Sequence, residues 1–445
     1  MKIFYQYFAL IMKIINVCNV KRKIMEKDII CNIIREAQDF IPRIKLYERP
    51  IQYEEKGNYV LVGVKQCGKS YMLYQRIQQL LREGHAISEM VYINFDDERL
   101  QTMKSDELDI ILQAHASMSE TKPLLFFDEI QNIDGWEHFA RRLANQKYQV
   151  FITGSNARML GRDIATTLGG RYWTRNIYPF SFQEYLGFKG IHLDKNWFHS
   201  AQERASVERA FDDYFHFGGF PEVQSVVAKR IWLNEIYNKI FFSDLVVRNK
   251  VRNESALRLT IRRIAESVKH PTAYNRISHL VKSTGASCHP NTVMDYASYL
   301  RDACLTFSLT NYATQFQERE SIKKHYFVDN GLLNIFLNND ETALLENLCA
   351  IHLHQQYSDG ELFFYNKNVE VDFYLPEKNT AIQACYNISN SQTTEREVNA
   401  LVKLHRYKPL ERAIIITRDQ EDTINASKGL TITVLPIWKW LLTED

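Results

Sequence analysis

One octet constrains the fold of this chain more than any other segment: Gly63, Val64, Lys65, Gln66, Cys67, Gly68, Lys69 and Ser70. It fits the pattern Gly-x4-Gly-Lys-Ser, and it lies between an apolar run at residues 59–62 and a helix-like segment at 71–77. The glycines let successive backbone N–H groups point inward at phosphate oxygens. Lys69 would reach the β- and γ-phosphates, and the Ser70 hydroxyl would ligate Mg²⁺. The octet therefore predicts a nucleoside triphosphate site, with ATP and Mg²⁺ as its ligands, rather than an ordinary turn.

A second motif consists of two carboxylates, Asp128 and Glu129, at the end of an apolar run at residues 123–127. Such a run is typical of a buried parallel strand, and open α/β sheets bind ligands at the carboxyl ends of their strands. Asp128 suits the Mg²⁺ shell, and Glu129 suits the base that polarises an attacking water. The alternative is a solvated acidic turn.

A third strand is predicted at residues 148–153, and polar side chains follow it. Thr153, Ser155 or Asn156 would face the γ-phosphate from this strand and position the water. We assign that role to Asn156, with helix capping as the alternative. The remaining core strand is predicted at residues 91–97.

Further motifs follow in order, and a family resemblance rests on them: residues 127–132 with Trp136, then 152–156, 168–172, 179–182 and 218–222. With the octet, they resemble the prokaryotic AAA-type P-loop ATPases that carry a winged helix and a C-terminal domain of unknown function. The resemblance implies an α/β fold with an AAA-type core and a helical lid. It also implies that Arg171 is an arginine finger or sensor, although Arg158, Arg162 and Arg175 are alternatives on charge alone.

The composition is that of a globular protein with several domains. The chain has 445 residues, of which 45% are hydrophobic and 24% charged. A net charge of +2 argues against a surface that is strongly basic throughout. The seven cysteines are scattered and form no Cys-x2-Cys pair, which favours reduced thiols and a cytoplasmic location. We expect no membrane association.

The chain divides into five predicted parts: an N-terminal extension at 1–27, the ATPase core at 28–180, the lid at 181–245, a winged helix at 246–339 and a C-terminal domain at 340–445. In the extension, Lys13 interrupts an apolar run that no cleavage site follows. We expect translation to begin at Met25.

The winged-helix prediction rests on a helix at 277–282, a break at 283–287 and a second helix at 291–300. Between Arg248 and Arg301 there are ten Lys or Arg and three Asp or Glu residues, an excess of seven positive charges (10 − 3). This excess favours double-stranded DNA as a partner, while packing against protein is the alternative. The predicted DNA contacts are phosphate contacts from Arg276 and Lys282, and contacts at the start of the second helix from His289, Asn291 and Thr292.

The C-terminal part resembles the PD-(D/E)xK nuclease fold. A helix at 341–354 carries Glu346, a strand at 369–375 carries Glu370 and Asp372, and the next strand is at 380–385. An active member would have an acid and a lysine on that last strand, where this chain has Gln383 and Cys385. We therefore predict a degenerate nuclease site at Glu346, Glu370, Asp372 and Gln383, with a structural or binding role.

Three functions remain open. The first is an ATPase that couples its nucleotide state to the winged helix and the C-terminal domain and acts on DNA. The second is a regulatory or signalling ATPase that binds a protein partner or forms a homo-oligomer. The third is an ATP-dependent nuclease, which the missing lysine disfavours.

Overall fold

The computed structural model describes residues 26–160, 166–194, 197–315, 321–358 and 360–443. Almost all of the predicted N-terminal extension, including the expected start at Met25, lies outside the described residues. The described chain forms two compact units. The first contains residues 26–60, 70–154 and 166–174, and the second contains 61–69, 155–160 and 175–443 without the gaps given above.

A five-stranded sheet has the strand order β2-β3-β4-β1-β5. Its strands are β1 (Tyr59–Val62), β2 (Met90–Asn94), β3 (Leu124–Asp128), β4 (Gln149–Gly154) and β5 (Trp173–Asn176). β3 pairs in parallel with both β2 and β4. Almost every residue of β1 to β4 is buried, as the continuous apolar runs predicted. β5 was not predicted, because all four of its residues are exposed and its sequence has no apolar run.

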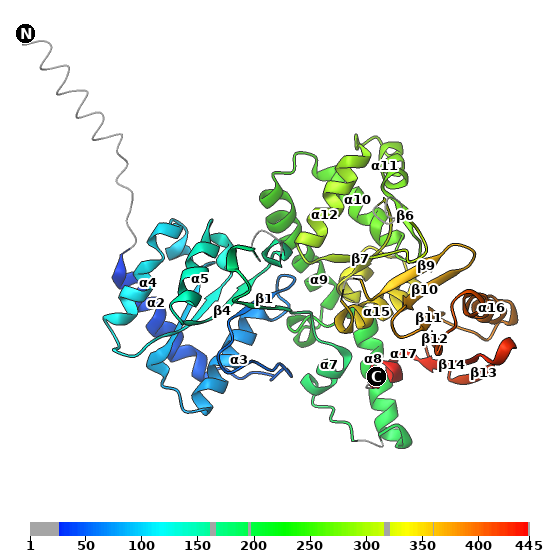
Figure 1. Ribbon diagram of the computed structural model, residues 1–445, viewed down its shortest axis with the longest axis horizontal. Coiled ribbons are helices and arrows are strands. Elements are labelled where there is room, and N and C mark those ends of the chain that lie inside the picture. Colours follow the sequence, from blue (N-terminus) through cyan, green and yellow to red (C-terminus); the bar gives the residue numbers. More distant parts are fainter. Residues whose placement is uncertain (1–25, 161–165, 195–196, 316–320, 359, 444–445) are drawn as a thin grey trace, which may run out of the picture. The chain divides into compact units, whose positions relative to one another are not determined.

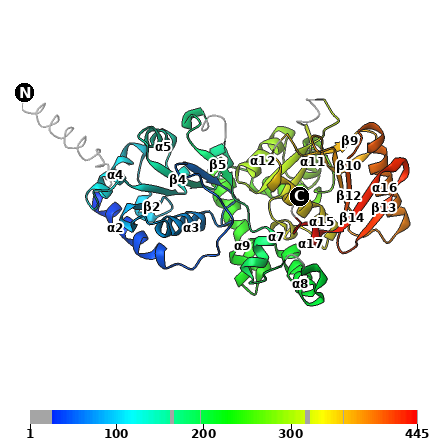
Figure 2. The same cartoon turned by 60° about the horizontal axis from the view of Figure 1, so that its bottom comes forward.

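Four helices accompany this sheet: α2 (Lys27–Phe40), α3 (Lys69–Arg82), α4 (Asp109–Ala116) and α5 (Trp136–Asn145). Figures 1 and 2 show α3 and α5 on opposite sides of β4. α2 packs against both α4 and β2. α3 begins within the octet, at Lys69, which confirms the predicted order of strand, loop and helix.

The segment predicted as the lid is helical. Its elements are α7 (Phe182–Phe188), α8 (Ala201–Phe217), α9 (Lys229–Lys239) and a π-helix, η9 (Ile240–Val247), which continues α9. Side-chain caps explain where two of these helices begin: Ser181 accepts a hydrogen bond from the Glu184 N–H, and Ser200 accepts one from the Glu203 N–H. The helix ends at Val247, slightly beyond the predicted boundary at 245.

The next elements are α10 (Glu254–Glu266), β6 (Thr272–Ala273), α11 (Tyr274–Ser283), α12 (Pro290–Asp302), β7 (Thr306–Thr310) and β8 (Ile322–Phe327). The strands form an antiparallel sheet of order β6-β8-β7. Pro290 is in the first turn of α12, and the predicted apolar stripe of Val293, Ala297 and Leu300 is buried. Both predicted helices are therefore present.

The rest of the second unit contains a six-stranded sheet of order β13-β14-β12-β11-β10-β9. The elements are α14 (Asn330–Asn334), α15 (Glu341–Gln356), β9 (Phe363–Asn366), β10 (Glu370–Leu375), β11 (Thr380–Ala384), α16 (Ser391–Tyr407), β12 (Arg412–Thr417), β13 (Asp422–Asn425), β14 (Thr431–Pro436) and α17 (Ile437–Trp440). β10 pairs antiparallel with β9 and β11, whereas β12 pairs in parallel with β11 and β14. Figure 1 shows the sheet between α15 and α16. Within the described residues, every helix is too short or too polar to span a bilayer.

Candidate functional site

The octet forms a tight loop in which both glycines have a structural reason. A Cβ atom at Gly63 would lie 2.0 Å from the carbonyl oxygen of Ile177, so no other residue fits without a shift of the backbone. Gly68 has a φ of 100°, a conformation that side-chain-bearing residues rarely adopt. The loop therefore requires glycine at the two positions that the phosphate-loop pattern specifies.

Lys69 lies at the start of α3, and its ammonium folds back onto the loop. Its Nζ donates hydrogen bonds to the carbonyl oxygens of Gly63 and Val64, both at 3.1 Å, and its side chain is buried. Ser70 follows it in the first turn of α3, and its hydroxyl lies near enough to the Asp128 carboxylate to lower the pKa of that group. The sequence had predicted Ser70 and Asp128 as partners at one Mg²⁺ ion, and the structure brings these two side chains together.

Asp128 is fully buried at the end of β3 and accepts hydrogen bonds from two hydroxyl groups. Tyr92 of β2 donates to its Oδ2 at 2.6 Å, and Thr153 of β4 donates to its Oδ1. Burial raises the pKa of Asp128, as does the adjacent Glu129, while the hydroxyl groups of Ser70, Thr153 and Tyr92 partly offset this rise. The hydroxyl groups that act on this carboxylate thus come from three different elements.

Glu129 follows β3 and has a left-handed backbone conformation, with a φ of 52°. Its backbone N–H donates to Thr153 Oγ1 at 3.0 Å, and the Gln131 side-chain amide donates to its carboxylate. A positive φ is uncommon for a residue other than glycine, and such strain is concentrated at functional sites. The chain here is bent so that Glu129 and Asp128 leave the strand in different directions.

Thr153 makes the contact with Asp128, whereas the sequence analysis chose Asn156 for the γ-phosphate. The Asn156 Oδ1 accepts a hydrogen bond from the Arg158 N–H at 2.9 Å, at the start of the 3₁₀ helix η6 (Ala157–Leu160). This is the capping geometry that was the alternative. Tyr92 was missed. Tyr92 lies on β2, the strand beside β3, two residues before Asn94, which is opposite Asp128. Because alternate side chains of a strand share a face, this position was the signal that could have identified Tyr92.

Arg171 is exposed and bonded locally. Its Nε donates to Asn145 Oδ1 at 2.7 Å, and its Nη1 donates to the carbonyl oxygens of Leu168 and Gly169. Its predicted role as an arginine finger or sensor stays a prediction.

A polar network within the second unit joins the octet to η9, and no sequence motif had predicted this network. Lys65 Nζ lies 3.2 Å from Ser243 Oγ and 3.9 Å from the buried Asp244 carboxylate. Arg248 pairs with Asp244 at 2.6 Å and donates to the Ser155 carbonyl oxygen at 3.4 Å. The charges of Lys65 and Arg248 are thus held by a single aspartate of the π-helix.

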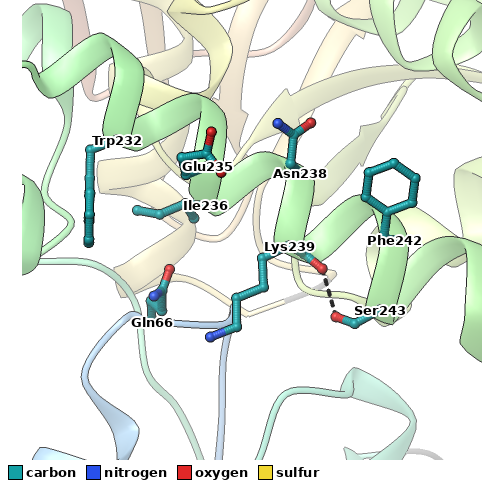
Figure 3. A pocket seen from close by; sticks show the side chains of 8 residues that line it. All are labelled: Gln66, Trp232, Glu235, Ile236, Asn238, Lys239, Phe242 and Ser243. Atoms are coloured by element: carbon teal, nitrogen blue, oxygen red, sulfur yellow. Dashed lines mark hydrogen bonds between the residues drawn. The ribbon is translucent and has the colours of Figure 1, made fainter.

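A pocket of about 590 Å³ opens beside this network. Figure 3 shows the Lys239 side chain extending toward Gln66 of the octet, with Trp232 and Phe242 farther along the helix. The full lining is Gln66, Trp232, Glu235, Ile236, Asn238, Lys239, Phe242 and Ser243. The pocket therefore combines a loop residue of the octet with both aromatic and charged residues of α9 and η9.

The side chains predicted to contact DNA lie on α11 and near the start of α12. Arg276, Lys282, His289 and Asn291 are exposed, and Thr292 is half-buried. These side chains thus lie at the surface, as contact with a nucleic acid would require.

The predicted nuclease residues do come together in the C-terminal part, but they surround a lysine that the sequence analysis missed. Lys324 of β8 contacts Glu346 of α15 and both Glu370 and Asp372 of β10. Gln383 of β11 accepts a hydrogen bond from the Asp372 N–H at 2.8 Å. In the described parts of the chain, no group of three or more His, Cys, Asp or Glu side chains is arranged to hold a metal ion.

Burial opposes the charge on Lys324, yet Asp372, Glu346 and Glu370 together raise the pKa of this lysine above its usual range. Burial and the nearby Asp372 raise the pKa of Glu346. A run of two lysines in a strand is typical of a solvated edge, so no sequence signal identified Lys324 as a buried residue.

Two protein families match parts of this chain. Residues 55–186 match an AAA domain, and residues 208–343 match a domain of unknown function, DUF8612. An uncharacterized protein of Methanocaldococcus jannaschii is 32% identical over 447 residues, covering 96% of this chain and 98% of the relative. An uncharacterized protein of Haemophilus influenzae is 30% identical over 304 residues, covering 66% of this chain and 73% of the relative.

Among solved structures, the Walker-type ATPase PABY2304 of Pyrococcus abyssi is similar, with 14% identity and a TM-score of 0.39 over 71% of this chain and 97% of the other. The Aeropyrum pernix Orc1 protein in complex with DNA has 14% identity and a TM-score of 0.30 over 72% and 93%. At these scores the two likenesses say nothing about shared ligands.

Proposed function

This chain belongs to the same family as the uncharacterized proteins of M. jannaschii and H. influenzae and contains an AAA domain, and on that basis we propose that it binds ATP with Mg²⁺ and hydrolyses it. The observation that carries the proposal is the convergence of the Ser70 hydroxyl, from the residue after the loop lysine, and the buried Asp128 carboxylate, whose pKa that hydroxyl lowers. A carboxylate and a hydroxyl are oxygen donors of the kind that Mg²⁺ prefers, so the residues present fit the ion.

The loop and Lys69 bind the phosphates in this proposal. The Lys69 ammonium now bonds two loop carbonyl oxygens, and it would exchange them for phosphate oxygens. When bound, Mg²⁺ supplies positive charge that offsets the charge of the β- and γ-phosphate oxygens. Ser70 and Asp128 would hold the ion. Asp128 acts as a carboxylate here, and an adjacent cation would counteract the effect of burial on its pKa.

Glu129 is the general base in this proposal. Its carboxylate would accept a proton from the attacking water, so that the nucleophile gains hydroxide character as the γ-phosphate is released. The left-handed backbone and the bond to Thr153 fix where the Glu129 side chain starts. The Gln131 amide donates a hydrogen bond to the Glu129 carboxylate and holds it in one position. For catalysis, this bond would have to break, or the two side chains would have to move toward the water together.

Two substitutions separate binding from hydrolysis. Lys69→Ala should abolish tight binding of a fluorescent ATP analogue, because the ammonium contacts the phosphates directly. Glu129→Gln should bind the analogue normally and lose phosphate release by about 10²–10⁴-fold, the usual contribution of a general base. Lys122→Ala is a control, since Lys122 is exposed and bonds the Gln146 and Lys147 carbonyl oxygens. Binding by Lys69→Ala at wild-type affinity would refute the site.

A second function, binding of double-stranded DNA, has its own support. The order α10-β6-α11-α12-β7-β8, with an antiparallel three-stranded sheet, supports the proposal of a winged helix. Two of its exposed polar residues, His289 and Asn291, lie at the start of α12, which would be the recognition helix, and the exposed Lys282 lies near the end of α11. We propose that this helix enters the major groove, with Arg276 and Lys282 on phosphates.

Binding should weaken steeply with salt, because phosphate contacts release counterions. Replacing both Arg276 and Lys282 by alanine should lower the slope of log affinity against log salt by about 2. Replacing Asn291 should instead reduce the preference among sequences. A fluorescence titration of a labelled duplex at several salt concentrations measures both effects. No binding at low salt would favour a protein partner for this surface.

The element order of the C-terminal part supports the proposal of a PD-(D/E)xK-like fold: α15, three antiparallel strands, α16 and a strand parallel to β11. We propose that it does not cut DNA, since Gln383 and Cys385 replace the acid and the lysine of the active motif. The Gln383 amide is also engaged with Glu397 at 2.8 Å. Supercoiled plasmid incubated with Mg²⁺ or Mn²⁺ should stay intact, and cutting that Asp372→Ala abolished would overturn this.

A further inference from the structure

An ammonium group occupies the centre of the C-terminal carboxylate cluster. Lys324 Nζ lies 2.8 Å from Asp372 Oδ1, 3.1 Å from Glu346 Oε1 and 3.4 Å from Glu370 Oε1. The Lys324 side chain has an exposed fraction of 0%. Carboxylates from a helix and a strand of the C-terminal part thus converge on one nitrogen, which is supplied by a strand of the preceding three-stranded sheet.

The alternation of side chains along β8 explains this placement. Lys324 and Tyr326 are two residues apart and therefore share one face of the strand. The Tyr326 hydroxyl donates to Glu346 Oε1 at 2.8 Å, the same oxygen that Lys324 contacts. His325 points to the other face, where its ring lies 5.8 Å from that of Tyr274. The strand thus directs both an ammonium and a hydroxyl at the carboxylates.

Asp372 is oriented by the neighbouring strand. Its Oδ2 accepts a hydrogen bond from the Ala384 N–H at 3.0 Å, which leaves Oδ1 for the ammonium. The Gln383 side chain accepts from the Asp372 N–H and donates to Glu397. Gln383 therefore ties β10 to β11 and does not point its oxygen at the cluster centre.

We propose that the Lys324 ammonium takes the place of a divalent cation in this cluster, so that the C-terminal part is held together without a metal. An ammonium has three N–H donors, which matches the three carboxylate oxygens around it. Clustered carboxylates repel one another and are stable only with a cation among them. Lysine supplies that cation permanently and also fastens β8 to α15 and β10.

A catalytic role for Lys324 fits the structure less well. A lysine that orients an attacking water must reach both solvent and substrate, and the side chain of Lys324 is entirely enclosed. Its ammonium also donates hydrogen bonds to Glu346 and Asp372 and lies 3.4 Å from Glu370. The proposed role is therefore structural, and it does not depend on the ATPase proposal, since it is tested on nucleotide-free protein.

Removal of the ammonium should open a metal site. Lys324→Ala leaves Glu346, Asp372 and Glu370 around a space with no cation, and oxygen ligands of this kind bind divalent ions. We expect this variant to bind one more Mn²⁺ per chain than the wild type, measured by electron paramagnetic resonance of free Mn²⁺. We also expect Mn²⁺ to raise its melting temperature, with no such rise in the wild type.

Two further variants make the result decisive. Lys324→Ala combined with Asp372→Asn should lose the gained Mn²⁺ site. Lys269→Ala is the matched control, because Lys269 pairs with one carboxylate, Asp340, at 2.9 Å, and its loss should create no metal site. A folded Lys324→Ala protein that gained no Mn²⁺, or a wild-type protein that bound Mn²⁺ here equally well, would overturn the proposal.

If Lys324→Ala does not fold, a variant with fewer charged groups in the cluster tests the proposal. Lys324→Met with Glu346→Gln and Asp372→Asn removes the cation together with two of the charges it balances. Recovery of a folded protein in this triple variant supports charge compensation by Lys324. Failure of the triple variant to fold would show that Lys324 is needed for its packing, and the proposal would be wrong.

Discussion

The two carboxylate clusters of this chain differ in what balances them. Asp128 of the first unit accepts hydrogen bonds from the hydroxyl groups of Tyr92 and Thr153, and the nearby Ser70 hydroxyl also lowers its pKa. Asp372 of the second unit faces the ammonium of Lys324. A hydroxyl stabilises a carboxylate without cancelling its charge, whereas an ammonium cancels it. The first cluster therefore still attracts an added cation, whereas in the second cluster the Lys324 ammonium already serves as the cation.

The largest expected effect concerns the first cluster. Asp128→Asn should reduce ATP turnover by at least about 10²-fold, because an amide cannot supply the negative charge that holds Mg²⁺. The same change should leave the melting temperature equal or higher, since burial already disfavours the charged form of Asp128. Phosphate-release assays and thermal unfolding measure the two effects.

Asp372→Asn is the control for this comparison and should leave turnover unchanged. Should Asp128→Asn retain turnover within about threefold of the wild type, the cluster at Asp128 would not be a cation site of the ATPase.

The second prediction concerns stability. Lys324→Ala should lower the free energy of unfolding by about 3–5 kcal/mol, the usual result of removing one partner from a buried ion pair. Urea denaturation in metal-free buffer measures this change. Replacing Lys269, whose ion pair with Asp340 is partly exposed, should lower the free energy of unfolding by only about 0–1 kcal/mol. Equal losses for the two variants would mean that the C-terminal cluster behaves like a surface ion pair.

The two clusters also differ in how well the sequence predicted them. The residues of the first form short motifs, because a phosphate loop needs glycine, lysine and serine at fixed spacing, and Asp128 ends an obvious apolar strand. Even so, the preference for Asn156 passed over Thr153, which contacts Asp128. That contact depends on which side chain of β4 faces Asp128, and this is set by the strand register.

Of the second cluster, only the acidic residues and Gln383 could be predicted from the sequence. Helix and strand patterns placed Glu346, Asp372 and Gln383 near one another, and the predicted elements that carry them, α15, β10 and β11, are present. Lys324 was not predictable, because its contacts are with residues 22 and 48 positions away along the chain. Only tertiary packing makes a lysine in a strand a buried cation, so local sequence carries no trace of it.

The third prediction uses His325, the neighbour of Lys324 on the opposite face of β8. Burial, together with the nearby charges of Arg301 and Lys323, lowers the pKa of His325 to about 3. An unfolded histidine has its ordinary value near 6.5, so the unfolded chain binds the extra proton between these values. The stability that the neutral ring contributes is therefore present above about pH 6.5 and is lost as the pH falls toward about 3.

His325→Phe keeps an aromatic ring and removes the titration. The difference in unfolding free energy between the two proteins should change by up to about 1.4 kcal/mol per pH unit in this window. Chemical denaturation at several pH values measures it. Parallel pH profiles for the two proteins would mean that His325 does not titrate differently on folding.

The smallest effects come from one pair of tyrosines, each of which donates a hydrogen bond to a buried carboxylate. Tyr92 lies 2.6 Å from Asp128, and Tyr326 lies 2.8 Å from Glu346. Either Tyr→Phe change removes one donor and should cost about 1–3 kcal/mol of stability, as hydrogen bonds to charged groups do. Only Tyr92→Phe should also alter ATP turnover, by several-fold, because only Asp128 is proposed to hold the metal of the ATPase. If Tyr326→Phe lowered turnover as much as Tyr92→Phe does, the two clusters would be coupled. The difference between a cluster that can take up a cation and one that already contains the Lys324 ammonium would then no longer explain their separate roles.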